Sequence, residues 1–506
     1  MTEDPSTRPR RPVGRTVAEV AAWLEDEGVP RRLLGEAPGD TRVTGITLSS
    51  QRVRPGDLYA ALPGSRTHGI SYLADALAAG AGAVLTDDEG AASVPAGLPG
   101  VVVDRPRRVL GELSAYVFGR PADRLTLIGV TGTQGKTTTT RLAEGGLLAA
   151  GVPAAVIGTV GTRIGGRDVA TALTTPEAPD LHGLFARMVE DGVAACAMEV
   201  SSHALVMGRV DGVVFDVAVF TNLGRDHLDF HDDLEDYYRA KASLFTIERA
   251  RLGLVSVDDE HGQRLVLDAS IPVRTLSLHN PGADWRAVDV VASATGSTFT
   301  VLGPDGLEVA AGCPLPGEFN VANTLAAVAA CAEAGYDAAR VAAGIAAGPG
   351  VPGRLERVDA GQDFLVVVDY AHKPDAIEAL LGTLRPLTAG ALIMVVGAGG
   401  DRDTGKRPLM GEAAARLADL VVVTDDNPRS EDPAAIRRAV LAGARGPAEL
   451  VEVGDRRTAI RAALDRARPG DVVVVAGKGH ETGQEVAGVV HPFDDRVVVT
   501  EELAAR

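Results

Sequence analysis

The sequence predicts an α/β protein of three domains, built on parallel sheets with helices on both faces. Apolar runs such as 125–130, 364–368 and 472–476 each end in polar residues, and helical segments separate them. Continuous apolar strands between helices are typical of parallel sheets covered on both faces. The length of 506 residues suits about three domains of about 150 residues. We expect domains at 1–122, 123–352 and 353–506.

The first predicted domain is small and alternates helices with strands. A Pro55-Gly56 turn divides two strands within 45–64. The other predicted elements are a helix over 16–28, a helix over 71–80, strands at 83–87 and 100–104, and a helix from Arg107. Residues 1–14 are charged and Pro-rich and lack the apolar core of a signal peptide, so we expect a disordered tail on a cytoplasmic protein.

The second domain begins with a strand at 125–130 that runs into a Gly-rich turn and a helix, and it continues through strands within 194–202 and 217–224. The third domain is predicted to be Rossmann-like. Its four apolar runs end in the polar segments DYAH, GGDRD, DDNPRS and GKGHE. Since the carboxyl ends of parallel strands meet at one edge of a sheet, these segments are expected to lie together.

Composition excludes several classes of function. The chain has 50 Lys+Arg and 68 Asp+Glu, a formal net charge of −18, which disfavours nucleic acid or an anionic membrane as the main partner. No apolar run reaches the ~18 residues that a membrane helix requires, so we expect no membrane insertion. Three scattered cysteines indicate neither a disulfide framework nor a structural zinc site.

Lysine is scarce, and its positions are informative. Only five of the 50 basic residues are lysine, which indicates that arginine serves wherever charge alone suffices. Lysine carries a compact charge and a titratable amine that arginine lacks. All five fall in candidate motifs, although five residues must fall somewhere: Lys136, Lys241, Lys373, Lys406 and Lys478.

The clearest motif is the loop after the strand at 125–130. Backbone N–H groups of such a loop, at the start of a helix, bind phosphate oxygens, while its lysine neutralises the β/γ phosphates and its Thr hydroxyl holds Mg²⁺. The first glycine of the common phosphate-loop spacing is replaced by Val130, which leaves a shorter GxxGKT core, and the alternative is a Gly-rich helix entry with an exposed lysine. The candidate nucleotide-binding residues are Gly132, Thr133, Gln134, Gly135, Lys136, Thr137 and Thr138.

Further polar residues follow strands or occupy the expected domain junction. Glu199 is a candidate ligand to Mg²⁺ or its water, and the segment 221–231, which includes His227, is unusually polar; the alternative for each is a surface loop. Asn320 and Asn323 are either ligands or helix caps, and Arg354 is either a phosphate contact or a surface residue.

Together these segments resemble the Mur ligases, the ATP-dependent amino acid ligases of peptidoglycan precursor assembly. The resemblance spans about Gly45 to Glu485 and rests on motifs in the family's order: TGTQGKTT, MEVSSHAL, TNLGRDHLDFH, YYRAK, GEFNVANT, GRLERV and DYAHKPDAI. It implies a UDP-binding first domain, a P-loop ATPase domain and an amino-acid-binding third domain. It also implies ATP as a substrate, two Mg²⁺ ions and small-molecule partners only, and we expect a monomer.

The resemblance also implies roles for individual residues. Lys241 matches a lysine that CO₂ carbamylates to form an anionic Mg²⁺ ligand, a modification that arginine cannot undergo. The implied metal-side residues are Thr137, Glu199, His227 and carbamylated Lys241, and the implied catalytic residues are Lys136, Lys241, His227, Glu199, Asp369 and His372. Asn320 and Arg354 join the ATP site. The residues implied to contact the UDP-muramyl dipeptide are Leu48, Ser50, Ser65, Arg66, Thr67, Thr174, Thr175, Ser201 and Arg209. Leu173 and Met207 depart from the family pattern, since relatives can carry Asn at the first position and some carry Gln at the second.

The third domain indicates the amino acid that is added. DDNPRS resembles the motif that selects meso-diaminopimelate, and lysine-adding relatives lack its arginine. A guanidinium at Arg429 would bind the distal carboxylate of diaminopimelate in bidentate fashion and repel the ε-ammonium of lysine. The implied acceptor-site residues are Arg402, Asp426, Asn427, Pro428, Arg429, Gly477 and Glu481. The alternatives are a ligase for lysine or another amino acid, a folate-polyglutamate or cyanophycin-type ligase, a P-loop NTPase without an amide product, and a non-catalytic scaffold.

Overall fold

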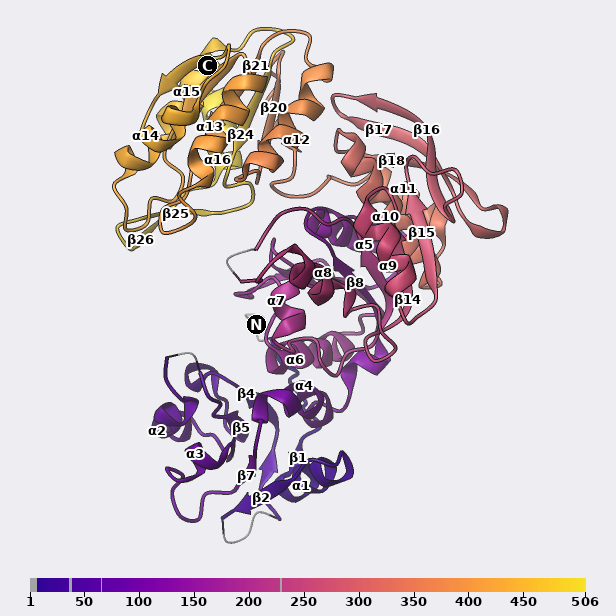
Figure 1. The fold of residues 1–506 in the computed structure, drawn as a ribbon, viewed down its shortest axis with the longest axis vertical. Coiled ribbons are helices and arrows are strands. Elements are labelled where there is room, and N and C mark those ends of the chain that lie inside the picture. The colour runs from indigo at the N-terminus through magenta and orange to yellow at the C-terminus, as the bar shows by residue number, and fades with distance from the viewer. Residues whose placement is uncertain (1–6, 36–38, 65, 228–229) are drawn as a thin grey trace. The chain divides into compact units, whose positions relative to one another are not determined.

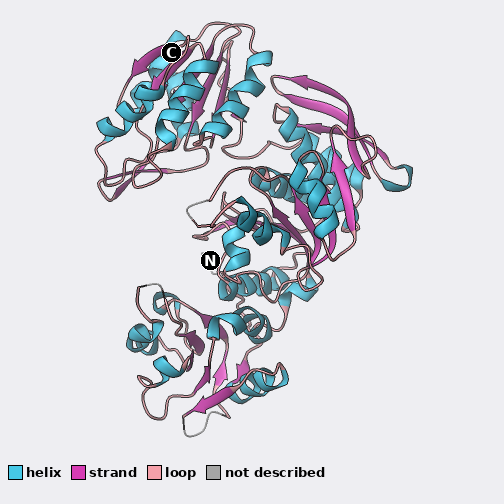
Figure 2. Ribbon diagram, in the orientation of Figure 1, coloured by secondary structure: helices cyan, strands magenta, loops and turns pink. Residues whose placement is uncertain are grey.

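The computed structural model describes residues 7–35, 39–64, 66–227 and 230–506. It divides into two compact units, one holding 1–286, 303–306 and 325–344, and the other holding 287–302, 307–324 and 345–506. Figures 1 and 2 show sheets flanked by helices in an α/β fold, as the sequence predicts.

The N-terminal sheet has the strand order β2-β7-β6-β5-β4, and only β2 runs antiparallel to its neighbour. Its two faces pack on different helices, because Leu58 and Ala60 join the cluster of α1 and α4, whereas Tyr59 joins that of α2. The strands are β1 (Arg15–Thr16), β2 (Arg31–Leu34), β3 (Arg42–Val43), β4 (Gly45–Thr47), β5 (Asp57–Ala60), β6 (Ala83–Thr86) and β7 (Gly100–Val103). The helices are α1 (Val17–Asp26), η1 (Ser50–Arg52), η2 (Gly69–Tyr72), α2 (Leu73–Ala78), α3 (Asp88–Ala91), α4 (Pro106–Val117) and η3 (Pro121–Arg124).

The prediction of a disordered tail over residues 1–14 is wrong for residues 7–14. Residues 1–6 lie outside the described part of the chain. Arg8 is buried, and its guanidinium binds both carboxylate oxygens of Asp57 at 2.7 and 2.6 Å. The backbone N–H groups of Arg10 and Arg11 donate to Glu190. A buried bidentate ion pair holds this segment on the fold, and composition alone did not reveal the partner carboxylates.

The central sheet carries the loop that the sequence predicts to bind phosphate. Eight of the eleven strands formed by its described residues lie in the order β11-β10-β9-β12-β8-β13-β14-β15, and of these β9, β12, β8, β13, β14 and β15 run parallel. These strands are β8 (Thr126–Thr131), β9 (Ala154–Ile157), β10 (Thr162–Ile164), β11 (Arg167–Val169), β12 (Ala195–Glu199), β13 (Phe215–Phe220), β14 (Ala250–Ser256) and β15 (Val273–Ser277). Its helices are α5 (Lys136–Ala149), α6 (Ala178–Glu190), α7 (Ser202–Val206), α8 (Leu234–Ala242) and α9 (Glu260–Asp268).

Antiparallel strands follow the parallel ones along the chain. β17 pairs antiparallel with β18, a feature that the alternation of strands and helices did not predict. The elements of this stretch are β16 (Trp285–Ser293), β17 (Gly296–Leu302), η4 (Pro304–Gly306), β18 (Glu308–Cys313), α10 (Glu318–Glu333) and α11 (Ala338–Ala346).

The C-terminal sheet has the order β19-β20-β24-β21-β22-β23 and is parallel apart from β19. Alternate residues of its strands pack on opposite layers, α12 to α14 on one face and α15 with α16 on the other. Its strands are β19 (Glu356–Arg357), β20 (Leu365–Asp369), β21 (Leu392–Val396), β22 (Leu420–Val423), β23 (Glu449–Glu452) and β24 (Val472–Ala476), followed by the hairpin β25 (Gly483–Val486) and β26 (Val489–Pro492). The helices are α12 (Pro374–Leu384), η5 (Arg385–Leu387), α13 (Lys406–Leu417), α14 (Pro433–Gly443), α15 (Arg456–Arg466) and α16 (Asp495–Ala504).

Candidate active site

The loop between β8 and α5 has the backbone of a phosphate-binding turn. Gly132 and Gly135 have φ angles of 143° and 87°, and Lys136 is the first residue of α5. A Cβ on Gly132 would lie 2.0 Å from Thr221 Oγ1, so only glycine fits there. The Lys136 ammonium donates to the carbonyl oxygens of Gly132 and Thr133 at 2.8 and 3.0 Å.

The end of β13 holds this loop in place. Asn222 Oδ1 accepts from the backbone N–H of Gln134 at 3.0 Å, and the Thr221 hydroxyl donates to the Gln134 carbonyl at 2.6 Å. The Thr133 hydroxyl lies 3.3 Å from the Tyr237 hydroxyl of α8. Thr137 and Thr138 are buried in the first turn of α5. The loop is therefore fixed by two neighbouring elements and not only by its own backbone.

Lys241 lies beside the same loop. Its side chain comes from α8 and is 1% exposed, and its ammonium donates to Gly132 O at 2.8 Å and lies over the Tyr237 ring. Burial, reinforced by the nearby charge of Lys136, lowers the pKa of Lys241 well below its usual range. A buried amine with a low pKa favours the neutral form, and the neutral form is the one that reacts with CO₂.

Glu199 ends β12, the strand beside β8. Its carboxylate is buried and accepts from the backbone N–H and the hydroxyl of Thr159 at 2.8 and 3.1 Å. A Cβ on Gly158 would lie 2.3 Å from Glu199 Oε1, so a glycine makes room for the carboxylate. These contacts hold an oxygen ligand at the carboxyl end of the sheet.

His227 sits in the loop after β13, with a positive φ of 53°. Its Nε2 lies 3.4 Å from Asp226 Oδ2, and its ring lies 4.9 Å from that of His203. Within the described ranges, no group of three His, Cys, Asp or Glu side chains forms a ready metal cage. The predicted metal set differs from such a cage because it includes Thr137 and a carbamate on Lys241.

The residues predicted to contact the muramyl dipeptide form one network beside Glu199. The Thr175 hydroxyl donates to the Glu199 carbonyl at 2.8 Å, and the Thr174 and Thr159 hydroxyls are 3.1 Å apart. Ser201 caps α7 by accepting from Ala204 N. Arg209 Nη1 donates to the Thr175 carbonyl at 3.3 Å.

The two departures from the family pattern, Leu173 and Met207, lie near this network in sequence. Leu173 is exposed, and Met207 Sδ accepts from Arg209 Nη2 at 3.4 Å. Neither side chain can make the polar contact of an amide.

The predicted nucleotide-sugar residues belong to the N-terminal sheet. Leu48 follows β4 and is half-buried, and Ser50 begins η1. Arg66 and Thr67 are exposed, and Ser65 lies outside the described residues.

Asn320 and Asn323 do not cap a helix, because both lie inside α10, which begins at Glu318. Asn320 Nδ2 donates to the Pro316 carbonyl at 2.8 Å, and Asn323 Nδ2 donates to Asn320 Oδ1 at 3.2 Å. Arg354 lies over the ring of Tyr370, 4.9 Å from its centroid.

Asp369 and His372 follow β20. Asp369 accepts from the backbone N–H groups of Leu355 and Ala371, both at 2.7 Å, and burial raises the pKa of Asp369. Burial lowers the pKa of His372 to about 4, so its imidazole is neutral near pH 7. His372 Nδ1 donates to the Tyr370 carbonyl at 2.8 Å, which leaves Nε2 as the basic nitrogen.

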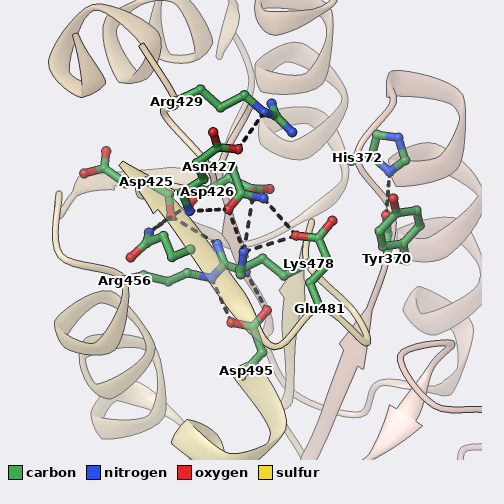
Figure 3. Close-up of polar contacts among 12 residues, drawn as sticks. Tyr370, His372, Asp425, Asp426, Asn427, Arg429, Arg456, Lys478, Glu481 and Asp495 are labelled. Carbon is green, nitrogen blue, oxygen red and sulfur yellow. Dashed lines mark hydrogen bonds and ion pairs between the residues drawn. The ribbon is translucent and has the colours of Figure 1, made fainter. Parts of the chain in front are cut away.

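The polar ends of β20, β21, β22 and β24 meet, as predicted. Asn427 Nδ2, after β22, donates to Glu481 Oε2, after β24, at 2.8 Å (Figure 3). The Gly477 N–H donates to the Asp369 carbonyl at 3.1 Å. Gly477 has a φ of 114°, and a Cβ there would lie 2.6 Å from Asp426 Oδ2, so glycine is required beside that buried carboxylate.

Arg429 joins three segments. Its Nη1 donates to the Gly400 carbonyl at 2.7 Å, and its Nε lies 3.4 Å from Glu485 Oε2 in β25 (Figure 3 shows the guanidinium). A Cβ on Gly399 would lie 3.0 Å from Arg429 Nη1 and 4.0 Å from Arg402 Cγ, so both arginines border the same glycine. The side chain of Arg429 is 25% exposed, turned toward the 399–402 loop and not into bulk solvent. Pro428 is buried between Asn427 and Arg429.

Several positioning contacts were not predicted, although His231 belongs to the polar segment 221–231 and Lys478 is one of the five lysines. His231 Nε2 lies 2.9 Å from the Ser202 hydroxyl and its Nδ1 lies 2.8 Å from Asp236, which ties the His227 loop to α7. The contact between Thr159 and Glu199 was not predicted either. The same holds for the contact between Lys478 and Asn427. The scarcity of lysine is the signal that singled out Lys478.

Family models match most of the chain. The middle domain of the Mur ligases matches residues 130–331, the glutamate ligase domain of the Mur ligases matches 353–479, and the catalytic domain of the Mur ligase family matches 42–117. The chain belongs to the Mur ligase family and is a peptide-forming ligase of three-domain architecture.

Its similarity extends to individual enzymes. It is 56% identical over 98% of each chain to the UDP-N-acetylmuramoyl-L-alanyl-D-glutamate–2,6-diaminopimelate ligase of Streptomyces coelicolor, and 55% identical over 99% of each chain to that of Streptomyces avermitilis. A solved structure of an enzyme with the same name matches with a TM-score of 0.66 and 35% identity, over 92% of this chain and 95% of that one. Among the described residues, no helix combines the length and apolar character that a membrane crossing demands.

Proposed function

We propose that the chain joins meso-2,6-diaminopimelate to the γ-carboxylate of D-glutamate in UDP-MurNAc-L-Ala-D-Glu, at the expense of ATP, in peptidoglycan precursor synthesis. The relatives named above support the reaction. The observation that carries the choice of acceptor is the cluster at the ends of β21, β22 and β24. There Arg429 lies beside the 399–402 loop, and Asn427 binds Glu481.

In the first step, an oxygen of the D-glutamate γ-carboxylate attacks the γ-phosphorus of ATP, and the bond to the β–γ bridging oxygen breaks, giving an acyl phosphate and ADP. The loop N–H groups and Lys136 bind the phosphates, since Lys136 begins α5 directly after the loop. Thr174, Thr175, Ser201 and Arg209 orient the dipeptide beside Glu199.

The donor set beside this loop fits magnesium. Thr137, Glu199, His227 and a carbamate on Lys241 would hold two Mg²⁺ ions, which neutralise phosphate charge when bound. The fit rests on the buried Glu199 carboxylate and on Lys241, whose lowered pKa favours the neutral amine. The carbamate forms when Lys241 Nζ bonds to the carbon of CO₂ and releases one proton.

In the second step, an amino group of diaminopimelate attacks the acyl carbon, and phosphate leaves from the tetrahedral intermediate. His372 Nε2 is available to accept a proton or to orient ATP, because the lowered pKa of His372 keeps the ring neutral. Asp369 is an equally good candidate for ribose binding, since its carboxylate is held by two backbone N–H groups.

The acceptor is selected by charge at its distal carbon. Arg429 would bind the second carboxylate of diaminopimelate, and Glu481 would bind the distal ammonium. Lysine lacks that carboxylate and would place its ε-ammonium beside the guanidinium, so it is disfavoured twice. Arg402, Asp426, Pro428 and Gly477 shape the remainder of the site.

The test is an ADP-release assay with the UDP-dipeptide and each candidate amino acid. We expect release that depends on meso-diaminopimelate, with L-lysine at least about 100-fold less effective at equal concentration, since opposing charge contacts differ by several kcal/mol. Equal turnover with lysine would favour a lysine-adding ligase. ADP release without any amino acid would favour an NTPase with no amide product.

We also propose that the protein acts as a cytoplasmic monomer on small-molecule substrates. Its net charge of −18 keeps copies apart and disfavours nucleic acid. Light scattering coupled to gel filtration should give a mass near the 52.2 kDa of one chain.

A further inference from the structure

Lys478 is a fully buried cation at the centre of the acceptor cluster. It follows Gly477 at the end of β24, and its side chain is 0% exposed. Burying an ammonium is costly unless hydrogen bonds and opposite charges compensate. Its ammonium lies 3.0 Å from Asn427 Oδ1, 3.2 Å from Glu481 Oε2 and 3.8 Å from Asp426 Oδ1 (Figure 3). The partners of Lys478 are therefore residues assigned above to acceptor binding.

The ammonium determines which way the Asn427 amide faces. An ammonium only donates, so the amide must turn its oxygen toward Lys478. Asn427 Oδ1 also accepts from the Glu485 backbone N–H at 3.0 Å. The amide nitrogen is then directed at Glu481 Oε2, which it reaches at 2.8 Å. The orientation of Asn427 follows from Lys478 and one backbone group.

Lys478 also holds Glu481. Glu481 Oε2 accepts from both Lys478 and Asn427, so the carboxylate is fixed through one oxygen. The Glu481 side chain is 33% exposed, whereas that of Lys478 is not exposed. A ligand can reach Glu481 but cannot reach the ammonium behind it, which makes Lys478 a support and not a contact.

The charges of the cluster leave room for one cationic group of a ligand. Asp426 and Glu481 carry two negative charges against the single positive charge of Lys478, so the three groups sum to one negative charge. Nearby Arg456 is neutralised by its own bidentate pair with Asp495, at 2.8 and 2.7 Å. The cluster can therefore accept one cationic group, such as an ammonium. Without Lys478, Asp426 and Glu481 would both lose the ammonium that lies 3.8 Å from the first carboxylate and 3.2 Å from the second.

We infer that Lys478 is a positioning residue for acceptor selection: it holds Asn427 and Glu481 in the arrangement that receives the distal ammonium of the added diamino acid. This inference rests on the proposed function. It predicts that loss of Lys478 weakens acceptor binding selectively, because its ammonium contacts Asn427, Glu481 and Asp426, which are all assigned to the acceptor and not to the nucleotide or the UDP-dipeptide.

The experiment measures KM for all three substrates in wild type and in Lys478→Met, a variant of similar length without the charge. We expect KM for meso-diaminopimelate to rise about 10-fold or more, as for a lost charge-assisted hydrogen bond, with the other two KM values within about twofold. Lys478→Gln keeps a donor for Asn427 Oδ1 and should show a smaller rise. If Lys478→Met does not fold, as judged by its circular dichroism and melting curve, Lys478→Gln carries the test against wild type.

Arg457→Met is the matched control, since it removes a cation paired with Glu501 and Glu502 outside the cluster. It should leave all three KM values unchanged. The double variant Lys478→Met/Glu481→Gln should resemble Glu481→Gln alone, because the two residues act as a unit.

A KM for meso-diaminopimelate within about twofold of wild type in Lys478→Met, or an equal rise for all three substrates, would overturn the inference. If wild-type ADP release does not depend on meso-diaminopimelate, the proposed function itself fails, and the two failures are thereby distinguished.

Discussion

At the scale of single residues, this protein keeps lysine where an amine, and not merely a charge, is useful. Lys241 and Lys478 are both buried, yet their surroundings differ. Lys241 has a carbonyl and an aromatic ring as neighbours, and burial lowers its pKa. Lys478 instead has carboxylates within reach. Burial thus favours the neutral amine of Lys241, whereas the side chain of Lys478 is surrounded by groups that accept its hydrogen bonds.

Replacing Lys241 by Arg should nearly abolish ADP release, because a guanidinium keeps the charge but cannot form a carbamate. The assay is ADP release at saturating substrates, and ¹³C NMR with labelled CO₂ should show a carbamate signal in wild type only. Arg239→Lys, at an exposed ion pair on the same helix, is the control and should retain activity. Substantial activity in Lys241→Arg would refute the carbamate role.

Replacing Arg429 by Lys should raise KM for meso-diaminopimelate by about 10-fold or more, since a bidentate contact becomes a single one. KM for ATP should not change. Arg438→Lys alters an exposed pair with Asp432 on α14 and provides the comparison. An unchanged KM in Arg429→Lys would remove Arg429 from the acceptor site.

At the scale of elements, α5 and the loop before it hold glycines with opposite requirements. Gly132, just before it, has no space for a Cβ, whereas nothing lies within 4 Å of a Cβ on exposed Gly145. The first glycine is needed by the phosphate-binding turn, and the second only costs helix stability.

Gly132→Ala should therefore lose ATP binding, because its methyl group would collide with Thr221. Gly145→Ala should keep full activity and stabilise the fold by about 1 kcal/mol through helix propensity. Nucleotide titration and thermal melting measure both effects. Normal ATP affinity in Gly132→Ala would contradict the assignment of the loop.

Helix α6 carries a buried histidine that should make stability depend on pH. Burial lowers the pKa of His182 to about 4, and its Nε2 donates to the Asp211 carbonyl. A folded pKa below the unfolded value of about 6.5 means that the stabilisation is complete above pH 6.5 and is lost as pH falls toward 4. His182→Gln keeps a donor without this titration, so its Tm should fall less steeply between pH 6.5 and 4.5. Parallel Tm profiles for the two proteins would exclude His182 as the cause.

At the scale of the whole molecule, the residues assigned to the two steps of the proposed reaction belong to different compact units. The phosphate loop belongs to one unit, and the acceptor cluster belongs to the other. An acyl phosphate must meet its amine while shielded from water, so the proposed reaction predicts that the chain becomes more compact when its substrates bind.

We expect small-angle X-ray scattering to show a smaller radius of gyration when the UDP-dipeptide and a non-hydrolysable ATP analogue are both bound. Either ligand alone should have a weaker effect. An unchanged radius with both ligands bound would show that closure is not part of the reaction.

The sequence by itself determined the parallel sheets and the Gly-rich loop, and it predicted the phosphate and acceptor sites. Apolar runs such as 472–476 depend only on local pattern, and the loop at 132–138 depends on the order of glycines, lysine and threonine. Apolar runs followed by polar residues also placed Asn427, Arg429 and Glu481 directly after strands. The roles of these three residues in binding stay predictions.

Only the tertiary structure decided which distant side chains share a contact. The pairs Arg8 with Asp57, Thr159 with Glu199, and Lys478 with Asn427 join residues 40 or more positions apart. The antiparallel pairing of β17 with β18 was likewise missed. Such pairings depend on sheet order and packing, which bring segments together without leaving a local periodic signal in the chain.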